Sequence, residues 1–92
     1  MTKYCKMHKK HDRHEGYFVH NNIRFKVKTY LREGYFDDDD YIWTELYKFR
    51  KGRYEWVYGN DWWEYNLRVD DAVNYLVDKC IDRDYINRWR KT

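Results

Sequence analysis

The ten residues IRFKVKTYLR, from Ile23 to Arg32, decide the fold class of this chain. Hydrophobic side chains or threonine occupy every second position, and charged residues or tyrosine occupy the positions between them. Successive side chains of a strand point to opposite faces of a sheet, so this alternation predicts a strand that is buried on one face and solvated on the other. Such a strand needs neighbours in an antiparallel sheet.

The segments on either side of this strand predict a meander. Residues 17–20 are expected to pair with it through a hairpin turn at Asn21-Asn22, because asparagine tolerates the positive φ that two-residue hairpin loops require. The remaining expected elements are an acidic loop at 34–40, strands at 41–50, 53–58 and 62–67, and turns at Lys51-Gly52 and Gly59-Asn60-Asp61.

The hydrophobic period changes from two to the helical spacing after residue 68. The apolar positions are Val69, Ala72, Val73, Leu76, Val77, Cys80 and Ile81. This spacing predicts an amphipathic helix with one apolar stripe. The fold class is therefore α+β: a four- to five-stranded antiparallel meander packed against one C-terminal amphipathic helix. Residues 84–89 extend this helix or form another turn.

Length and composition restrict the class of protein. A chain of 92 residues has room for one hydrophobic core, which we place in residues 17–92. Five Trp and eleven Tyr make that core aromatic. No run of about 18 apolar residues and no apolar signal segment is present, so the cytoplasm is the expected location. Two cysteines are too few for a disulfide framework and are expected to be reduced thiols.

Residues 1–16 form a basic leader with five Lys or Arg, two acidic residues and three His. Cys5, His8, His11 and His14 could supply thiolate and imidazole ligands to zinc, the only cofactor that the sequence suggests. However, structural zinc sites usually draw their ligands from two separated segments. The alternative is a partly mobile leader whose histidines are solvated.

Four consecutive aspartates, Asp37, Asp38, Asp39 and Asp40, mark the loop before the second long strand. Calcium loops need alternating acidic residues, a central glycine and a later glutamate, and the loop lacks this pattern. We expect a solvated acidic loop. Its contribution to binding would be electrostatic, because four carboxylates on a turn could occupy a groove that normally holds phosphates.

The solvated positions of the first long strand carry cations and one aromatic ring: Arg24, Lys26, Lys28, Tyr30 and Arg32. Cations with interleaved rings on a sheet are typical of single-stranded nucleic-acid binding, in which cations hold phosphates and rings stack on bases. The competing interpretation is an ordinary solvated sheet face, where lysine, arginine and tyrosine are common.

The aromatic side chains of the following strands suggest a second kind of interface. One helix cannot cover a whole sheet, so Tyr47, Tyr54, Trp56 and Tyr58 are candidates for an exposed patch, and exposed aromatic rings are typical hot spots of protein interfaces. Alternatively, the helix shields one face and the leader shields the other.

Catalysis is not expected, because the chain has no serine and no glycine-rich phosphate loop. A small ribonuclease using His11, His14, Glu15, Arg24 and Tyr30 is the one enzymatic alternative. The leading hypothesis is a small binding protein that occludes a surface of a larger host protein or nucleoprotein complex. Its abundance of Asn, Lys, Asp and Tyr resembles translation from an A+T-rich genome and suggests a phage or mobile-element inhibitor of a host defence system. A sheet-based module that binds single-stranded RNA or DNA is the alternative.

Overall fold

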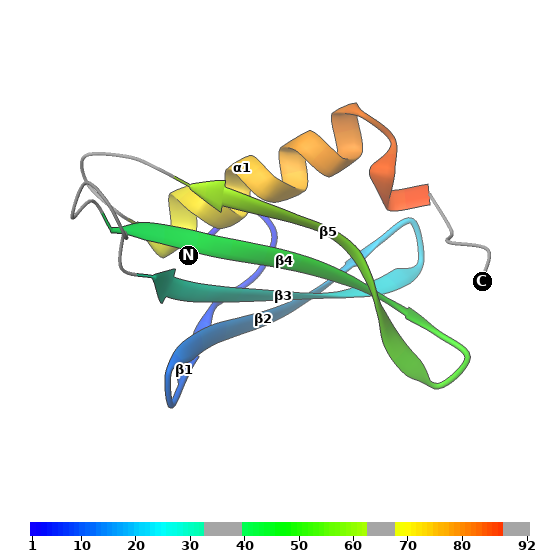
Figure 1. Ribbon diagram of the computed structural model, residues 1–92. Helices are drawn as coiled ribbons and strands as arrows, with labels where there is room; N and C mark the ends of the chain where they lie inside the picture. The colour runs from blue at the N-terminus through cyan, green and yellow to red at the C-terminus, as the bar shows by residue number, and fades with distance from the viewer. Residues whose placement is uncertain (33–39, 63–67, 88–92) are drawn as a thin grey trace.

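Five strands and one helix make up the computed structural model, which describes residues 1–32, 40–62 and 68–87. The strands are β1 (His8–Lys10), β2 (Arg13–His20), β3 (Ile23–Arg32), β4 (Tyr41–Arg50) and β5 (Arg53–Trp62). They pair antiparallel in chain order. Helix α1 (Val69–Asp82) and the short 3-10 helix η1 (Tyr85–Asn87) follow, and α1 lies across one face of the twisted sheet (Figure 1). The predicted α+β meander with one C-terminal helix is confirmed.

The core lies between α1 and the inward-facing residues of β3 and β4. Phe25, Val27 and Leu46 are almost completely buried. They pack against the predicted stripe of α1, whose buried members are Ala72, Val73, Leu76, Val77 and Cys80. Residues 85–87 form η1, so the chain makes a separate turn after α1. Among the described residues, no helix is both long and apolar enough to cross a bilayer.

Two predicted hairpin turns are present. Asn21 and Asn22 have φ values of 51° and 65°, and Lys51 and Gly52 have 51° and 81°. Positive φ at both central residues matches the twist of the flanking strands, which is why such turns join hairpins tightly. The Asn21-Asn22 turn sets the register in which Tyr17 lies opposite Lys26.

The predicted turn at Gly59-Asn60-Asp61 is wrong, because β5 continues through these residues to Trp62. A Cβ atom on Gly59 would lie only 2.6 Å from the indole ring of Trp43. The glycine therefore permits a close approach of an aromatic ring to the strand. The predicted strand at 62–67 consequently loses its first residue to β5, and residues 63–67 lie outside the described part of the chain.

Residues 1–7 pack against α1. Lys3 Nζ forms an ion pair with Asp78 at 2.7 Å, and the Tyr4 hydroxyl donates a hydrogen bond to the same carboxylate. Cys5 is buried over Gly16, where a Cβ atom would lie 2.7 Å from the thiol sulfur. Residues 8–16 continue into β1 and β2, so the proposed boundary after residue 16 falls within β2, and β1 is a strand that we did not predict.

Candidate functional site

The candidate site is the face of the sheet opposite α1, which we call the outer face. Helix α1, η1 and residues 1–7 all contribute to the core on the other face. In the described ranges 1–32, 40–62 and 68–87, no helix or loop packs over the outer face. The leader therefore does not shield it, and the alternative in which both faces are covered does not hold for the described residues.

The strand register arranges the outer face in rows that run across the strands. One row is Tyr17, Lys26, Tyr47 and Trp56. The row nearer the Asn21-Asn22 and Lys51-Gly52 turns contains Val19, Arg24, Phe49 and Tyr54. These eight residues form the cation–aromatic patch. None of them carries a carboxylate.

Close contacts between rings and cations organise the cation–aromatic patch. Lys26 Nζ lies 4.7 Å from the ring centroid of Tyr54 and 5.2 Å from that of Tyr47. The centroids of Tyr17 and Tyr54 are 5.9 Å apart, although β3 and β4 lie between their strands. At such distances the negative faces of aromatic rings attract cations. The rings thus hold Lys26 at the centre of the patch.

The charged residues of this patch, Arg24 and Lys26, are both cationic. Burial and the charge of neighbouring Lys28 lower the pKa of Lys26. Side chains of Arg24 and Lys26 form no ion pair within 4 Å with any described residue. Exposed Lys51 and Arg53 lie at the adjoining β4–β5 turn. Arg53 is paired with Glu55 at 3.7 Å. An anionic ligand would neutralise Arg24 and Lys26, which have no carboxylate within ion-pair distance among the described residues.

The other half of the outer face is an ionic cluster around Glu15. Glu15 is only 4% exposed, yet it carries a charge: burial alone would raise its pKa, but hydrogen bonds and charge from Arg13 and Lys10 lower it to about 2. The Glu15 oxygens lie 2.7 Å from Arg13 Nε and 3.1 Å from Lys10 Nζ. Lys28 stands between Glu15 and Glu45 in the next row, so carboxylates compensate the cations here.

The structure divides the predicted nucleic-acid residues between these two halves. Arg24 and Lys26 belong to the cation–aromatic patch, and Lys28 lies at its border, 5.2 Å from the ring of Tyr47. Tyr30 and Arg32 lie at the far end of β3, where the Arg32 guanidinium packs 5.1 Å from the Tyr30 ring.

Tyr58 is not part of the outer face, although Tyr47, Tyr54 and Trp56 are. A bulge between Leu46 and Tyr47 changes the register: Tyr47 pairs with Trp56, but Leu46 pairs with Tyr58. The extra residue in β5 turns Tyr58 to the helix side, where its ring packs 4.8 Å from that of Tyr85. Strict alternation, on which the prediction rested, would have placed Trp56 and Tyr58 on one face.

Most of the predicted acidic loop, residues 34–39, lies outside the described residues. Asp37, Asp38 and Asp39 are not among the described residues, and Asp40 is exposed just before β4.

The four candidate zinc ligands are not brought together. Cys5 is buried in the core on the helix side of the sheet. His8 and His11 are exposed, and His14 is half-buried opposite Thr29 on the helix side. Within residues 1–32, 40–62 and 68–87, no group of three or more His, Cys, Asp or Glu side chains could hold a metal ion. Burial raises the pKa of the Cys5 thiol and raises that of Cys80 to about 12.

The residues of the ribonuclease alternative are also separated. Glu15, Arg24 and Tyr30 lie on the outer face, whereas His14 belongs to the helix side and His11 to the β1–β2 turn. His14 therefore lies on the opposite face of the sheet from Glu15, Arg24 and Tyr30.

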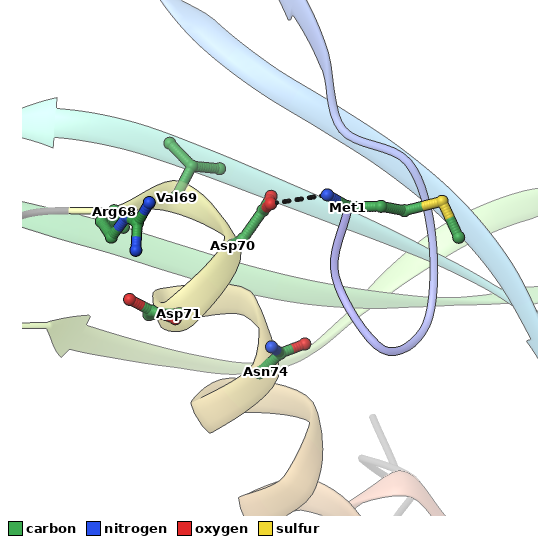
Figure 2. A pocket seen from close by; sticks show the side chains of 6 residues that line it. All are labelled: Met1, Arg68, Val69, Asp70, Asp71 and Asn74. Atoms are coloured by element: carbon green, nitrogen blue, oxygen red, sulfur yellow. Dashed lines mark hydrogen bonds and ion pairs between the residues drawn. The ribbon is translucent and has the colours of Figure 1, made fainter.

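A wide hollow of about 490 Å³ opens at the start of α1, lined by Met1, Arg68, Val69, Asp70, Asp71 and Asn74 (Figure 2). The Met1 amino group forms an ion pair with Asp70 at 2.9 Å, and both groups are substantially exposed. Two carboxylates, Asp70 and Asp71, and two cations, the Met1 amino group and Arg68, line this hollow, so its charges balance, unlike those of the cation–aromatic patch. The hollow lies between Met1 and the start of α1 and is not part of the candidate site.

Comparisons with known proteins give no independent assignment: no family model, no curated protein and no solved structure matches the chain. The candidate site therefore depends on its own geometry.

Three residues of the site were missed from the sequence: Tyr17, Val19 and Phe49. The signal that could have found the first two is the Asn21-Asn22 turn, which places Tyr17 opposite Lys26 and Val19 opposite Arg24 once it is taken as a two-residue loop. Phe49 follows from the alternation of β4.

Proposed function

We propose that this protein is a small domain that binds single-stranded nucleic acid on the cation–aromatic patch. The observation that supports this most is that, among the described residues, half of a sheet face over which no helix or loop packs combines Arg24, Lys26 and five aromatic rings, and none of the eight residues of the patch is acidic. Cations attract phosphates, and rings offer stacking surfaces to bases of any sequence.

The aromatic rings of the patch favour an unpaired strand over a duplex as the ligand. A duplex presents phosphates at its surface and keeps the faces of its bases stacked inside, so the aromatic rings of the patch would stay unused. A single strand can place phosphates on the cations and bases on Tyr17, Tyr54 or Trp56 at the same time. Of these, Tyr17 and Trp56 are 50% and 40% exposed.

Neutralising Lys26 at the centre of the patch together with Lys28 at its border is expected to reduce the salt dependence of binding. For Lys26→Gln with Lys28→Gln, the slope of log K against log salt for a single-stranded oligomer should fall by about 1.4, since each phosphate contact contributes about 0.7. Glutamine is preferable to glutamate at residue 28, because a glutamate there would stand between Glu15 and Glu45. Fluorescence anisotropy at several salt concentrations measures the slope.

The matched control changes two exposed lysines outside the patch, Lys6→Gln with Lys9→Gln, and should leave the slope nearly unchanged. Equal effects of the two double variants would mean that the ligand responds only to net charge. Such a result would contradict the proposed site.

A second candidate function is occlusion of a protein surface, as expected of a phage inhibitor of a host complex. Exposed apolar groups on the outer face favour it: Trp56, Tyr17 and Val19, of which Val19 is 66% exposed. Exposed aromatic rings and arginine are enriched in the hot spots of protein interfaces.

Capture of partners from a native lysate, with and without nuclease, distinguishes the two functions. If a protein is occluded, it should be retained after nuclease and lost with Trp56→Ala, because the anchor dominates the off-rate. Tyr75→Ala is the control, since Tyr75 is 42% exposed on α1, away from the outer face. Loss of every captured component on nuclease treatment would contradict occlusion and favour the nucleic-acid function.

A further inference from the structure

We infer that a hollow beside Arg24 is a base-reading subsite for guanine, an inference that rests on the proposed nucleic-acid function. The hollow has a volume of about 160 Å³ and lies where the β2–β3 hairpin meets β5. Its lining consists of Tyr17, Phe18, Val19, Arg24, Phe25 and Tyr54. Four of these six residues, Tyr17, Val19, Arg24 and Tyr54, belong to the cation–aromatic patch.

Apolar groups surround a single charged group in this hollow. Tyr17 and Tyr54 contribute rings, Val19 contributes an aliphatic wall, and the side chains of Phe18 and Phe25 belong to the core beneath. Stacking rings and one placed polar group are the composition of sites that take a planar aromatic ligand. A nucleobase has this shape and chemistry.

Arg24 has its donors available for such a base. Its guanidinium carbon lies 5.7 Å from the ring centroid of Phe49, so the ring supports the side chain through a cation–π contact. No side-chain hydrogen bond or ion pair joins Arg24 to another described residue. The N–H groups of the guanidinium can therefore pair with a ligand.

The chemistry of the lining selects among the bases. An arginine fork pairs in bidentate fashion with the O6 and N7 acceptors of guanine, whereas adenine is read by the amide of Asn or Gln and cytosine by a carboxylate. Neither an amide nor a carboxylate side chain lines the hollow. Guanine is thus the base whose edge the hollow complements.

A single guanine placed in a short oligothymidylate tests this subsite. An eight-nucleotide strand with one central guanine is expected to bind at least about fivefold more tightly than the all-thymine strand, and a central adenine should give less than a twofold gain. The same series in RNA shows whether the sugar matters. Fluorescence anisotropy measures the affinities at one fixed salt concentration.

Arg24→Lys separates the bidentate contact from the charge. Lysine retains the cation but lacks the planar fork, so the guanine preference should fall below twofold while the affinity for all-thymine strands changes little. Arg53→Lys is the matched control and should retain the full preference, because Arg53 is exposed beside the β4–β5 turn, at the same end of the sheet, but does not line the hollow. Arg24 is exposed, so circular dichroism and thermal melting should match the parent.

Each alternative outcome has a defined meaning. Equal binding of guanine and adenine strands would overturn the subsite, and so would a full guanine preference in Arg24→Lys. In either case the proposed function would still stand if the oligomers bind in a salt-dependent way. If no oligomer binds in a salt-dependent way, the proposed function fails, and the subsite fails with it.

Discussion

Leu76→Ala is expected to lower the free energy of unfolding by about 2 to 5 kcal/mol. Leu76 is completely buried in the middle of the α1 stripe and packs in the core with Val27 and Leu46 of the sheet. Its truncation removes apolar contacts and leaves a cavity, because strands paired on both sides cannot collapse into the space. Urea unfolding followed by tryptophan fluorescence measures the change.

Asp82→Ala on the same helix is the matched control for Leu76→Ala. Asp82 is exposed at the end of α1, where a negative charge opposes the helix dipole, so its removal should be neutral or slightly stabilising. A loss below about half a kcal/mol for Leu76→Ala would show that α1 does not dock as the structure has it.

Acidification is expected to remove about 3 kcal/mol of stability through Glu15 alone. Its pKa is lowered from 4.5 to about 2 in the folded protein. A carboxylate with a lowered pKa contributes its full stabilisation above the unfolded value, so this contribution is lost as the pH falls from about 4.5 to about 2. The near-complete burial of Glu15 makes its ion pairs with Arg13 and Lys10 more effective than surface pairs.

Glu15→Gln isolates this contribution from that of the other carboxylates. The variant should be less stable than the parent at pH 7, and the difference should shrink toward zero near pH 2, where Glu15 of the parent becomes protonated. Urea melts of both proteins at the two pH values give the difference. Asp12→Asn is the control, because Asp12 forms only an exposed pair with Arg13 at 3.6 Å and should show a small difference at both pH values.

A difference that stays constant with pH would mean that glutamine disturbs packing without changing an ionic interaction. That outcome would remove the ionic cluster as the organiser of this half of the outer face. It would not by itself contradict the cation–aromatic patch, whose ring and cation contacts around Lys26 are made by Tyr47 and Tyr54.

Local sequence signals were sufficient for the strands and turns whose conformation depends on neighbouring residues. The alternation of β3, the Asn21-Asn22 and Lys51-Gly52 turns and the stripe of α1 are all present as predicted. Each depends on a period or a φ preference that a few adjacent residues encode.

Gly59 shows where local signals fail. Glycine next to Asn60 and Asp61 indicates a turn by composition, but the indole of Trp43 on the neighbouring strand needs the space that a Cβ atom would take. The residue that determines its role lies sixteen positions away in the chain and beside it in the sheet. The bulge that turns Tyr58 to the helix side is of the same kind, because it exists only in the pairing of β4 with β5.

By itself, the sequence determined the class of fold, the helix face that is buried, and the cations and aromatic rings available for binding, because hydrophobic period and side-chain chemistry are properties of the chain. Only the tertiary structure decided which of these groups share a surface. It placed residues 1–7 beside α1, so that they do not cover the outer face, and it paired Glu15 with Lys10 and Arg13. It also gathered Tyr17, Lys26 and Tyr54 from three strands, because cross-strand register is set by contacts between segments far apart in the sequence.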